Sequence, residues 1–132
     1  MKTILTSFML LLINLPLLAQ KSATDLAQQQ LDAYNHRDIE AFLLPYSDTV
    51  KVFNFPAAFL YQGIEEMRKR YSPMFEKQKD LHCTLVNRMS LGNMVIDQES
   101  VIFDKTKPPV EVFAIYKVAA NKIQEVYFMR PD

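Results

Sequence analysis

The feature that most constrains the fold is a change of hydrophobic period in the second half of the 132-residue chain. From Leu81 onward apolar and polar residues alternate, which is typical of strands with one buried face. The alternation predicts strands over 81–89, 94–103, 110–118 and 122–129, separated by short turn-forming links. Because short links favour antiparallel neighbours, this half of the chain is expected to form an antiparallel sheet.

The first half of the chain has helical spacing instead. Ala27, Leu31 and Tyr34 fall on one face of a helix predicted over 23–35. The other elements expected before Leu81 are a short helix over 38–44, a strand over 49–55, a short strand over 59–61 and a helix over 64–75.

This order of elements predicts an α+β domain in which helices cover one face of an antiparallel sheet. The run 110–118 is apolar on both faces at its middle, as in a central strand whose two sides are covered. The face away from the helices is expected to close around a cavity, to pack on a second subunit, or to do both, because a bare apolar sheet promotes aggregation. A homodimer is therefore expected.

The N-terminus predicts export. Lys2 is followed by about fifteen mainly apolar residues, the pattern of a signal peptide, and the run is too short and too interrupted by Asn14 and Pro16 to favour the alternative of an uncleaved anchor. Cleavage after Ala19 would leave 1–19 as the signal peptide and 20–132 as one domain. A periplasmic or secreted protein with no membrane attachment after cleavage is expected.

Charge and motif content exclude several classes of function. Lys and Arg total 15 and Asp and Glu total 15, which leaves no basic field for a nucleic-acid partner. His36 and His82 have no ligand at a metal-binding spacing, so neither a metal nor a cofactor is expected.

Asp97 and Glu99 are the candidate catalytic residues. They stand two apart on a predicted strand and therefore share a face. If that face lines a pocket, low dielectric and mutual repulsion would raise one pKa and give an acid and a base. If it faces water, both are ordinary solvated carboxylates. Cys83, the only cysteine, is expected to be a buried small apolar residue and not a reactive thiol.

Tyrosines are numerous in so short a chain, and a tyrosine that lines an apolar cavity supplies both contact area and a hydroxyl group. Tyr34 and Tyr71 lie on apolar helix stripes and Tyr116 lies on a central strand, so these three are candidate ligand-binding residues. The alternative for each is ordinary core packing.

Basic residues occur at two further places. Glu65 and Glu66 stand four residues before Lys69 and Arg70, which predicts a charge-paired, exposed helix face. Arg130, near the end of the last strand, could pair with an acidic ligand or with a surface carboxylate.

Several stretches carry a resemblance to a known family: YNHRDIEAF at 34–42, GIEEMRKRY at 63–71, NRMSLGNMVID at 87–97 and AIYKV at 114–118. The chain resembles the nuclear transport factor 2-like superfamily, in particular exported bacterial members of its SnoaL-like, ketosteroid-isomerase-like branch. The resemblance implies a cystatin-like cone, in which a strongly bent antiparallel sheet wraps around the helix at 63–75 and leaves an apolar pocket between them.

The resemblance also identifies positions to inspect. Ketosteroid isomerases use an aspartate base, with a tyrosine and a protonated aspartic acid as the oxyanion hole. These roles fall near Asn54, Gln30 and Ala114, and none matches, so the isomerase mechanism is not carried over. Gln30 can still donate a hydrogen bond to a ligand, and Asn54 is a candidate ligand-binding residue by its position.

Three functional hypotheses follow. The first is an exported homodimer that binds a small, mostly apolar molecule in the pocket. The second is a proton-transfer isomerase or lyase, of steroid-isomerase or polyketide-cyclase type, with Asp97 or Glu99 as base and Tyr116 or Gln30 as donor. The third is a structural or interaction module whose pocket is filled by its own side chains.

Overall fold

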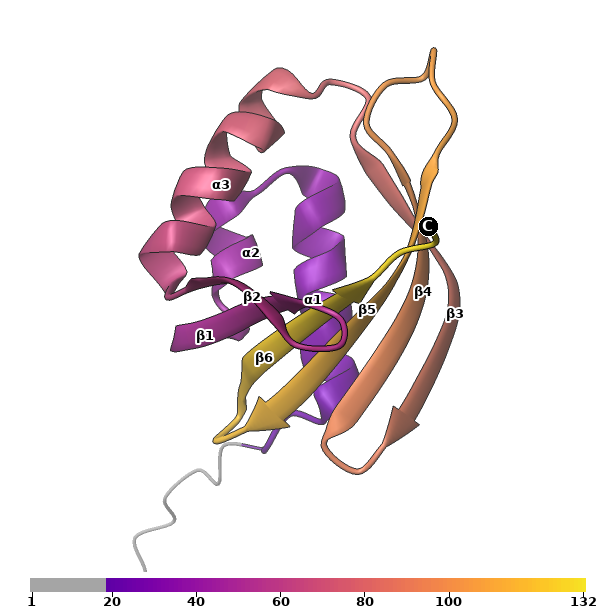
Figure 1. Ribbon diagram of the computed structural model, residues 1–132. Coiled ribbons are helices and arrows are strands. Elements are labelled where there is room, and N and C mark those ends of the chain that lie inside the picture. Colours follow the sequence, from indigo (N-terminus) through magenta and orange to yellow (C-terminus); the bar gives the residue numbers. More distant parts are fainter. Residues whose placement is uncertain (1–18) are drawn as a thin grey trace, which may run out of the picture.

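The structure, a computed structural model, describes residues 19–132. The predicted signal peptide therefore lies outside the described residues except for Ala19. The elements in chain order are α1 (Ala23–His36), α2 (Ile39–Leu43), β1 (Tyr46–Asn54), β2 (Ala58–Gln62), α3 (Ile64–Lys77), β3 (His82–Leu91), β4 (Met94–Ile102), β5 (Val110–Ala119) and β6 (Lys122–Met129) (Figure 1). The predicted α+β fold class is confirmed.

Local signals explain where the first two helices begin. Ser22 caps α1 by accepting a hydrogen bond from the Asp25 amide, and the Asp25 carboxylate accepts one from the Ser22 amide. The helix ends at Arg37, whose φ of 53° lies in the left-handed region. Asp38 then caps α2 through the Ala41 amide.

The sheet has six strands in the order β2-β1-β6-β5-β4-β3. Neighbouring strands are antiparallel, as predicted, except that β1 and β6 run parallel. The expectation of a wholly antiparallel sheet is therefore wrong at this one pair. The long stretch of chain between β1 and β6, which contains α3 and four strands, makes a parallel neighbour possible.

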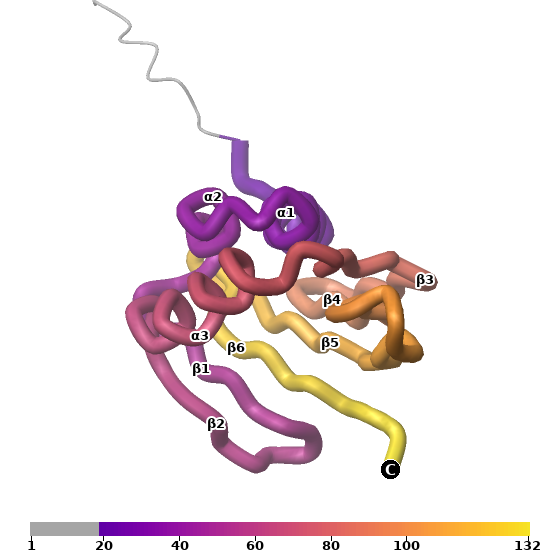
Figure 2. Tube along the Cα trace, turned by 90° about the horizontal axis from the view of Figure 1, so that it is seen from above, coloured from indigo at the N-terminus to yellow at the C-terminus, as the bar shows by residue number. Residues whose placement is uncertain are grey.

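The three helices lie on one side of the curved sheet (Figure 2). The helix that packs along the sheet is α1, which contacts β3, β4, β5 and β6, whereas α3 contacts β1, β2 and α2. The prediction that the sheet wraps around the helix at 63–75 is thus wrong. The reason is burial: Leu26, Ala27 and Leu31 of α1 are almost fully enclosed, and α3 fully buries only Met67 and Phe75.

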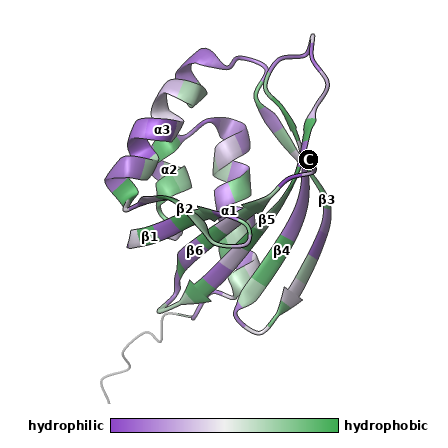
Figure 3. Ribbon diagram, in the orientation of Figure 1, coloured by the Kyte–Doolittle hydropathy of each residue, from purple (hydrophilic) through white to green (hydrophobic). Residues whose placement is uncertain are grey.

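Strand β5 is central, as predicted, and its side chains alternate strictly. Val112, Ala114 and Tyr116 are buried beneath the helices, while Phe113 and Ile115 point to the other face. Apolar and polar segments accordingly alternate along the strands in Figure 3. Strand β4 follows the same alternation but places two carboxyl groups among its buried residues.

Candidate functional site

A cavity of about 340 Å³ opens between the helices and the sheet. Its lining is mainly aromatic and aliphatic, with few polar groups, which is the usual make-up of a small-molecule pocket. The lining residues are Gln30, Leu31, Tyr34, Phe42, Tyr46, Asn54, Leu60, Tyr61, Arg70, Tyr71, Met74, Cys83, Glu99, Phe103, Val112, Tyr116, Phe128 and Arg130.

The helical wall of the cavity is built from packed rings. Phe42 of α2 lies 4.6 Å from Tyr71 of α3 between ring centroids, and 6.1 Å from Tyr34 of α1. Tyr34 and Tyr71 meet edge to face at 6.4 Å. Such aromatic contacts, one from each helix, fix the shape of this wall.

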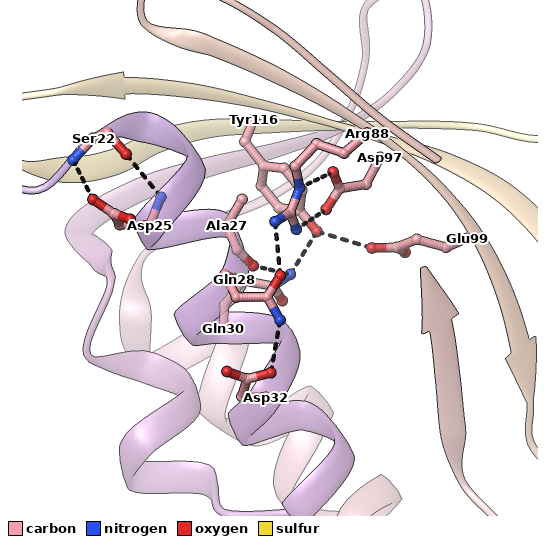
Figure 4. Close-up of polar contacts among 10 residues, drawn as sticks. All are labelled: Ser22, Asp25, Ala27, Gln28, Gln30, Asp32, Arg88, Asp97, Glu99 and Tyr116. Atoms are coloured by element: carbon pink, nitrogen blue, oxygen red, sulfur yellow. Dashed lines mark hydrogen bonds and ion pairs between the residues drawn. The ribbon is translucent and has the colours of Figure 1, made fainter. Parts of the chain in front are cut away.

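Gln30 of α1 and three strand residues, Tyr46, Glu99 and Tyr116, supply the polar floor of the cavity. The Tyr46 hydroxyl donates to Gln30 Oε1 over 3.2 Å, and Gln30 Nε2 donates to the Tyr116 hydroxyl over 2.9 Å. The Tyr116 hydroxyl in turn donates to Glu99 Oε1 over 3.4 Å. Figure 4 shows Gln30 and Tyr116 meeting between α1 and the sheet, with Glu99 beyond them.

The direction of this hydrogen-bond chain is fixed by the backbone. Gln30 Nε2 also donates to the Ala27 carbonyl over 3.1 Å, and a carbonyl can only accept. The amide nitrogen therefore faces Tyr116, which receives a hydrogen bond and directs its own hydrogen toward Glu99 or a ligand. Burial raises the pKa of Tyr116 well above its ordinary value, so it stays a neutral donor.

Among residues 19–132, Glu99 is the one carboxyl group in the cavity lining, and only 6% of it is exposed. Burial, reinforced by the charge of Asp97, raises its pKa from 4.5 to about 7. Hydrogen bonds with Cys83 and Tyr116 and the positive charge of Arg88 oppose this shift without cancelling it. Glu99 is therefore placed to exchange a proton near neutral pH.

Asp97 shares the buried face of β4 with Glu99, as predicted, but it does not line the cavity. Its carboxylate accepts hydrogen bonds from Arg88 Nε and Nη2, each 2.7 Å long. Arg88 Nη1 also donates to Gln28 Oε1, which ties this pair to α1. The bidentate pairing holds Asp97 as a structural anion, so we do not retain it as a candidate base.

The other predicted site residues lie where a ligand could reach them. Those that line the cavity are Gln30, Tyr34, Asn54, Tyr71, Glu99 and Tyr116. Ala114, the third position taken from the resemblance, is buried in the sheet outside the lining. Cys83 is buried as predicted, and burial raises the pKa of its thiol, although its side chain also borders the cavity.

Sequence reasoning missed Tyr46 and Arg70. Tyr46 shares the buried face of β1 with Val50 and Val52, but the polar Asp48 between them interrupts the alternation that would have revealed it. Arg70 was predicted to pair with Glu66 on an exposed helix face. It is exposed as predicted, but it borders the cavity and does not pair with Glu66.

The carboxylate that was expected to hold Arg70 is bound elsewhere, since Glu66 pairs with Lys69. The guanidinium of Arg70 lies instead 4.4 Å from the centre of the Tyr61 ring.

Within residues 19–132, no three His, Cys, Asp or Glu side chains come together in a group able to hold a metal ion. In the same part of the chain, no helix is long and apolar enough to cross a membrane.

Solved structures of similar fold come from several bacteria. A cystatin-fold protein from Novosphingobium aromaticivorans superposes with a TM-score of 0.75 at 22% identity, covering 83% of this chain and 99% of its own. A SnoaL-like protein of unknown function from Burkholderia thailandensis gives 0.70 at 14% identity, covering 83% and 94%. An LEH-like epoxide hydrolase from M. tuberculosis gives 0.67 at 13% identity, covering 83% and 78%.

These identities establish a shared fold and no shared activity. No curated protein matches the chain. The sequence model of the SnoaL-like domain matches residues 27–126. Because this match spans most of the chain, the protein belongs to the SnoaL-like domain family.

Proposed function

We propose that the protein binds a small, mostly apolar molecule in the cavity between its helices and sheet. The observation that carries the proposal is the cavity itself, about 340 Å³ of space with a mainly aromatic and aliphatic lining and a hydrogen-bonded floor. This volume lies within the range of known ligand pockets, roughly 300–1,000 Å³. A structural module with a filled interior, the third hypothesis, would leave no such space.

A neutral fluorescent probe tests this proposal. N-phenyl-1-naphthylamine should bind the wild-type protein and gain fluorescence, because it leaves water for an apolar site. Met74→Trp should abolish this binding, since Met74 lines the cavity and an indole there would fill it. Lys77→Trp is the matched control, because Lys77 is exposed on the same helix and outside the lining.

Equal fluorescence with the wild type and both variants, or none with any of them, would contradict a ligand-binding cavity.

Proton transfer is a second candidate function, favoured by one specific observation. Glu99 combines a pKa of about 7 with a neighbouring hydroxyl donor, Tyr116, at the floor of the cavity. A base that is partly ionised at neutral pH can accept a proton from the carbon next to a carbonyl group. The Tyr116 hydroxyl would then stabilise the enolate oxygen, and Gln30 would keep that hydroxyl oriented.

This second candidate predicts catalysed hydrogen exchange. The ketone 2-tetralone in D₂O should take up deuterium at its enolisable positions faster with the wild type than with Glu99→Gln. Tyr116→Phe should retain the base and lose part of the acceleration, about a hundredfold to a thousandfold for one hydrogen-bond donor to the developing charge. Exchange at the same rate with the wild type and Glu99→Gln would remove Glu99 as the base.

We propose further that the chain is exported and cleaved after Ala19. The composition of the N-terminal residues supports this, and so does the position of Ser22, which caps α1 shortly after the expected new N-terminus. N-terminal sequencing of protein recovered outside the cytoplasm should give Gln20 as the first residue. Recovery of the full-length chain in the cytoplasm would contradict export.

A further inference from the structure

Two arginines at the cavity differ from Arg68 and Arg88 in their partners. Arg68 pairs with Glu40 and Arg88 pairs with Asp97. Arg70 and Arg130 both line the cavity, and among the described residues neither forms an ion pair with a carboxylate. The cavity is therefore bordered by two guanidinium groups that have no anionic partner within this part of the chain.

The charges of the lining leave an excess of positive charge. In the part of the chain that the structure describes, the lining contains two basic side chains, Arg70 and Arg130, and one acidic side chain, Glu99. Its tyrosines and Cys83 are neutral. The two arginines outweigh Glu99 even when its carboxyl group is ionised. An anion that enters this cavity is attracted overall.

The position of Arg130 follows from strand alternation. Phe128 and Arg130 share the inward direction, while Tyr127 and Met129 point to the outer face. Arg130 follows Met129, the last residue of β6, and is exposed to solvent at the border of the cavity. Val112, which is paired with Glu99 on β4, lines the same cavity.

Arg70 is held in place by its aromatic neighbour. Its guanidinium lies over the ring of Tyr61, which is itself buried, at 4.4 Å from the ring centre. Among the described residues this guanidinium has no carboxylate partner, so its N–H groups can donate to a ligand. The planar edge of a guanidinium matches the two oxygens of a carboxylate.

We infer that the ligand is an amphipathic carboxylic acid. Its carboxylate binds Arg70 and Arg130, its apolar body packs against the aromatic wall, and its far end lies at the Glu99–Tyr116 floor. This inference rests on the proposed ligand-binding function and specifies the chemical class of the ligand.

Matched probes of equal shape and different charge test the inference. The set is 4-phenylbutanoate, 4-phenylbutanamide and 4-phenylbutylamine, together with 1-naphthaleneacetate and its amide. Each is measured by displacement of bound N-phenyl-1-naphthylamine, which is neutral. The carboxylates should displace the probe at concentrations about tenfold lower than their amides, the advantage expected of a charge-assisted contact, and the amine should be weakest.

Arginine variants locate the effect. Arg70→Gln and Arg130→Gln should each remove part of the preference for carboxylate over amide, and the double variant should remove all of it. Binding of the neutral fluorescent probe is measured for each variant, so that the preference is calculated relative to the affinity of that variant for a neutral molecule. Lys77→Gln removes the same charge from an exposed position outside the lining and should keep the full preference.

The outcomes separate this inference from the proposal on which it rests. If the neutral probe binds but carboxylates and amides displace it equally, the ligand class is wrong and ligand binding stands. A carboxylate preference that survives in the double variant would likewise overturn the role of the two arginines. If the neutral probe itself does not bind the wild type, both the proposed function and this inference fail.

Discussion

Glu99 and Asp97 show how neighbouring residues set the behaviour of the same functional group. Both carboxyl groups are buried on one face of β4. Arg88 compensates Asp97 with two charged hydrogen bonds, whereas the hydrogen-bonding neighbours of Glu99 are the neutral Tyr116 hydroxyl and Cys83 thiol. Asp97 is therefore part of the core. Glu99 lines the cavity, and its pKa is raised to about 7.

The raised pKa of Glu99 makes stability depend on pH. The folded protein keeps this proton up to about pH 7, while the unfolded chain releases it near the ordinary value of 4.5. The contribution of Glu99 is therefore fully present below pH 4.5 and is lost as the pH rises through 7. Between pH 4 and pH 8, Glu99→Gln should gain about 3 kcal/mol of unfolding free energy relative to the wild type.

Urea denaturation at several pH values measures this change. Glu76→Gln, a substitution at an exposed position of α3, is the control and should follow the wild type at every pH. If the difference in unfolding free energy between Glu99→Gln and the wild type stayed constant from pH 4 to pH 8, the pKa of Glu99 would be the same in the folded and unfolded states.

The buried pair gives a second prediction at this scale. Arg88→Ala leaves the fully buried Asp97 carboxylate without compensation and should cost about 3 kcal/mol of unfolding free energy at neutral pH. Arg68→Ala breaks the exposed pair with Glu40 and should cost far less, because solvent screens an exposed ion pair. Denaturant unfolding compares the two variants, and similar losses would mean that Arg88 does not compensate a buried charge.

Some of these residue roles could be predicted from sequence and others could not. The period of two placed Asp97 and Glu99 on one face, because alternation is a local property of a strand. The alternation could not assign the two carboxyl groups different roles. Arg88 on β3 pairs with Asp97 across the β3–β4 hairpin, and of the two carboxyl groups only Glu99 lines the cavity. The role of Arg70 was missed for a similar reason. Helical spacing allows Glu66 to pair with either Lys69 or Arg70, and the sequence does not show that Glu66 pairs with Lys69.

At the scale of elements, α1 positions much of the site. It carries Gln30 and Tyr34 to the cavity and packs along four strands of the sheet. Its start is fixed by the reciprocal hydrogen bonds of Ser22 and Asp25. The stability of this helix end should therefore contribute to the stability of the whole domain.

Removing the cap tests this contribution. Ser22→Ala should lower the free energy of unfolding by about 1 kcal/mol, because the Asp25 amide loses its acceptor. Ser90→Ala, at an exposed position of β3, is the control and should change stability little. Thermal unfolding followed by circular dichroism compares them, and an unchanged midpoint for Ser22→Ala would exclude a role for the cap.

Elements were easier to predict than their arrangement. Each predicted helix and strand is present, with boundaries displaced by a few residues, because hydrophobic period and capping residues act locally. The parallel pairing of β1 with β6 and the packing of α1 along the sheet depend on contacts between distant parts of the chain. Local periodicity carries no information about such contacts.

At the scale of the whole molecule, the outer face of the sheet carries a continuous apolar band. The band consists of one residue from each strand, paired in register across the sheet: Met89, Ile96, Ile115, Tyr127, Phe53 and Phe59. Phe53 and Tyr127 stack at 4.8 Å between ring centroids. We propose that a second copy of the chain covers this band, since a continuous exposed apolar surface promotes association.

Light scattering during gel filtration tests the dimer. The wild-type protein should elute with twice the mass of one chain, and Ile115→Glu, at the middle of the band, should elute as a monomer because it would bury an uncompensated charge at the interface. Leu44→Glu places the same charge on an exposed apolar residue of the helical side and should remain a dimer. A wild-type monomer would contradict the proposal.

The central claim is that a ligand-sized cavity encloses a carboxyl group that titrates near neutrality. The most direct test is carbon-13 NMR titration of the Glu99 side-chain carboxyl, assigned with Glu99→Gln, with and without saturating N-phenyl-1-naphthylamine. We expect the titration midpoint of Glu99 to lie near pH 7 without the probe. With the probe bound the midpoint should be higher, because the probe excludes water from the carboxylate. A midpoint near the ordinary value of 4.5 in both states would contradict the claim.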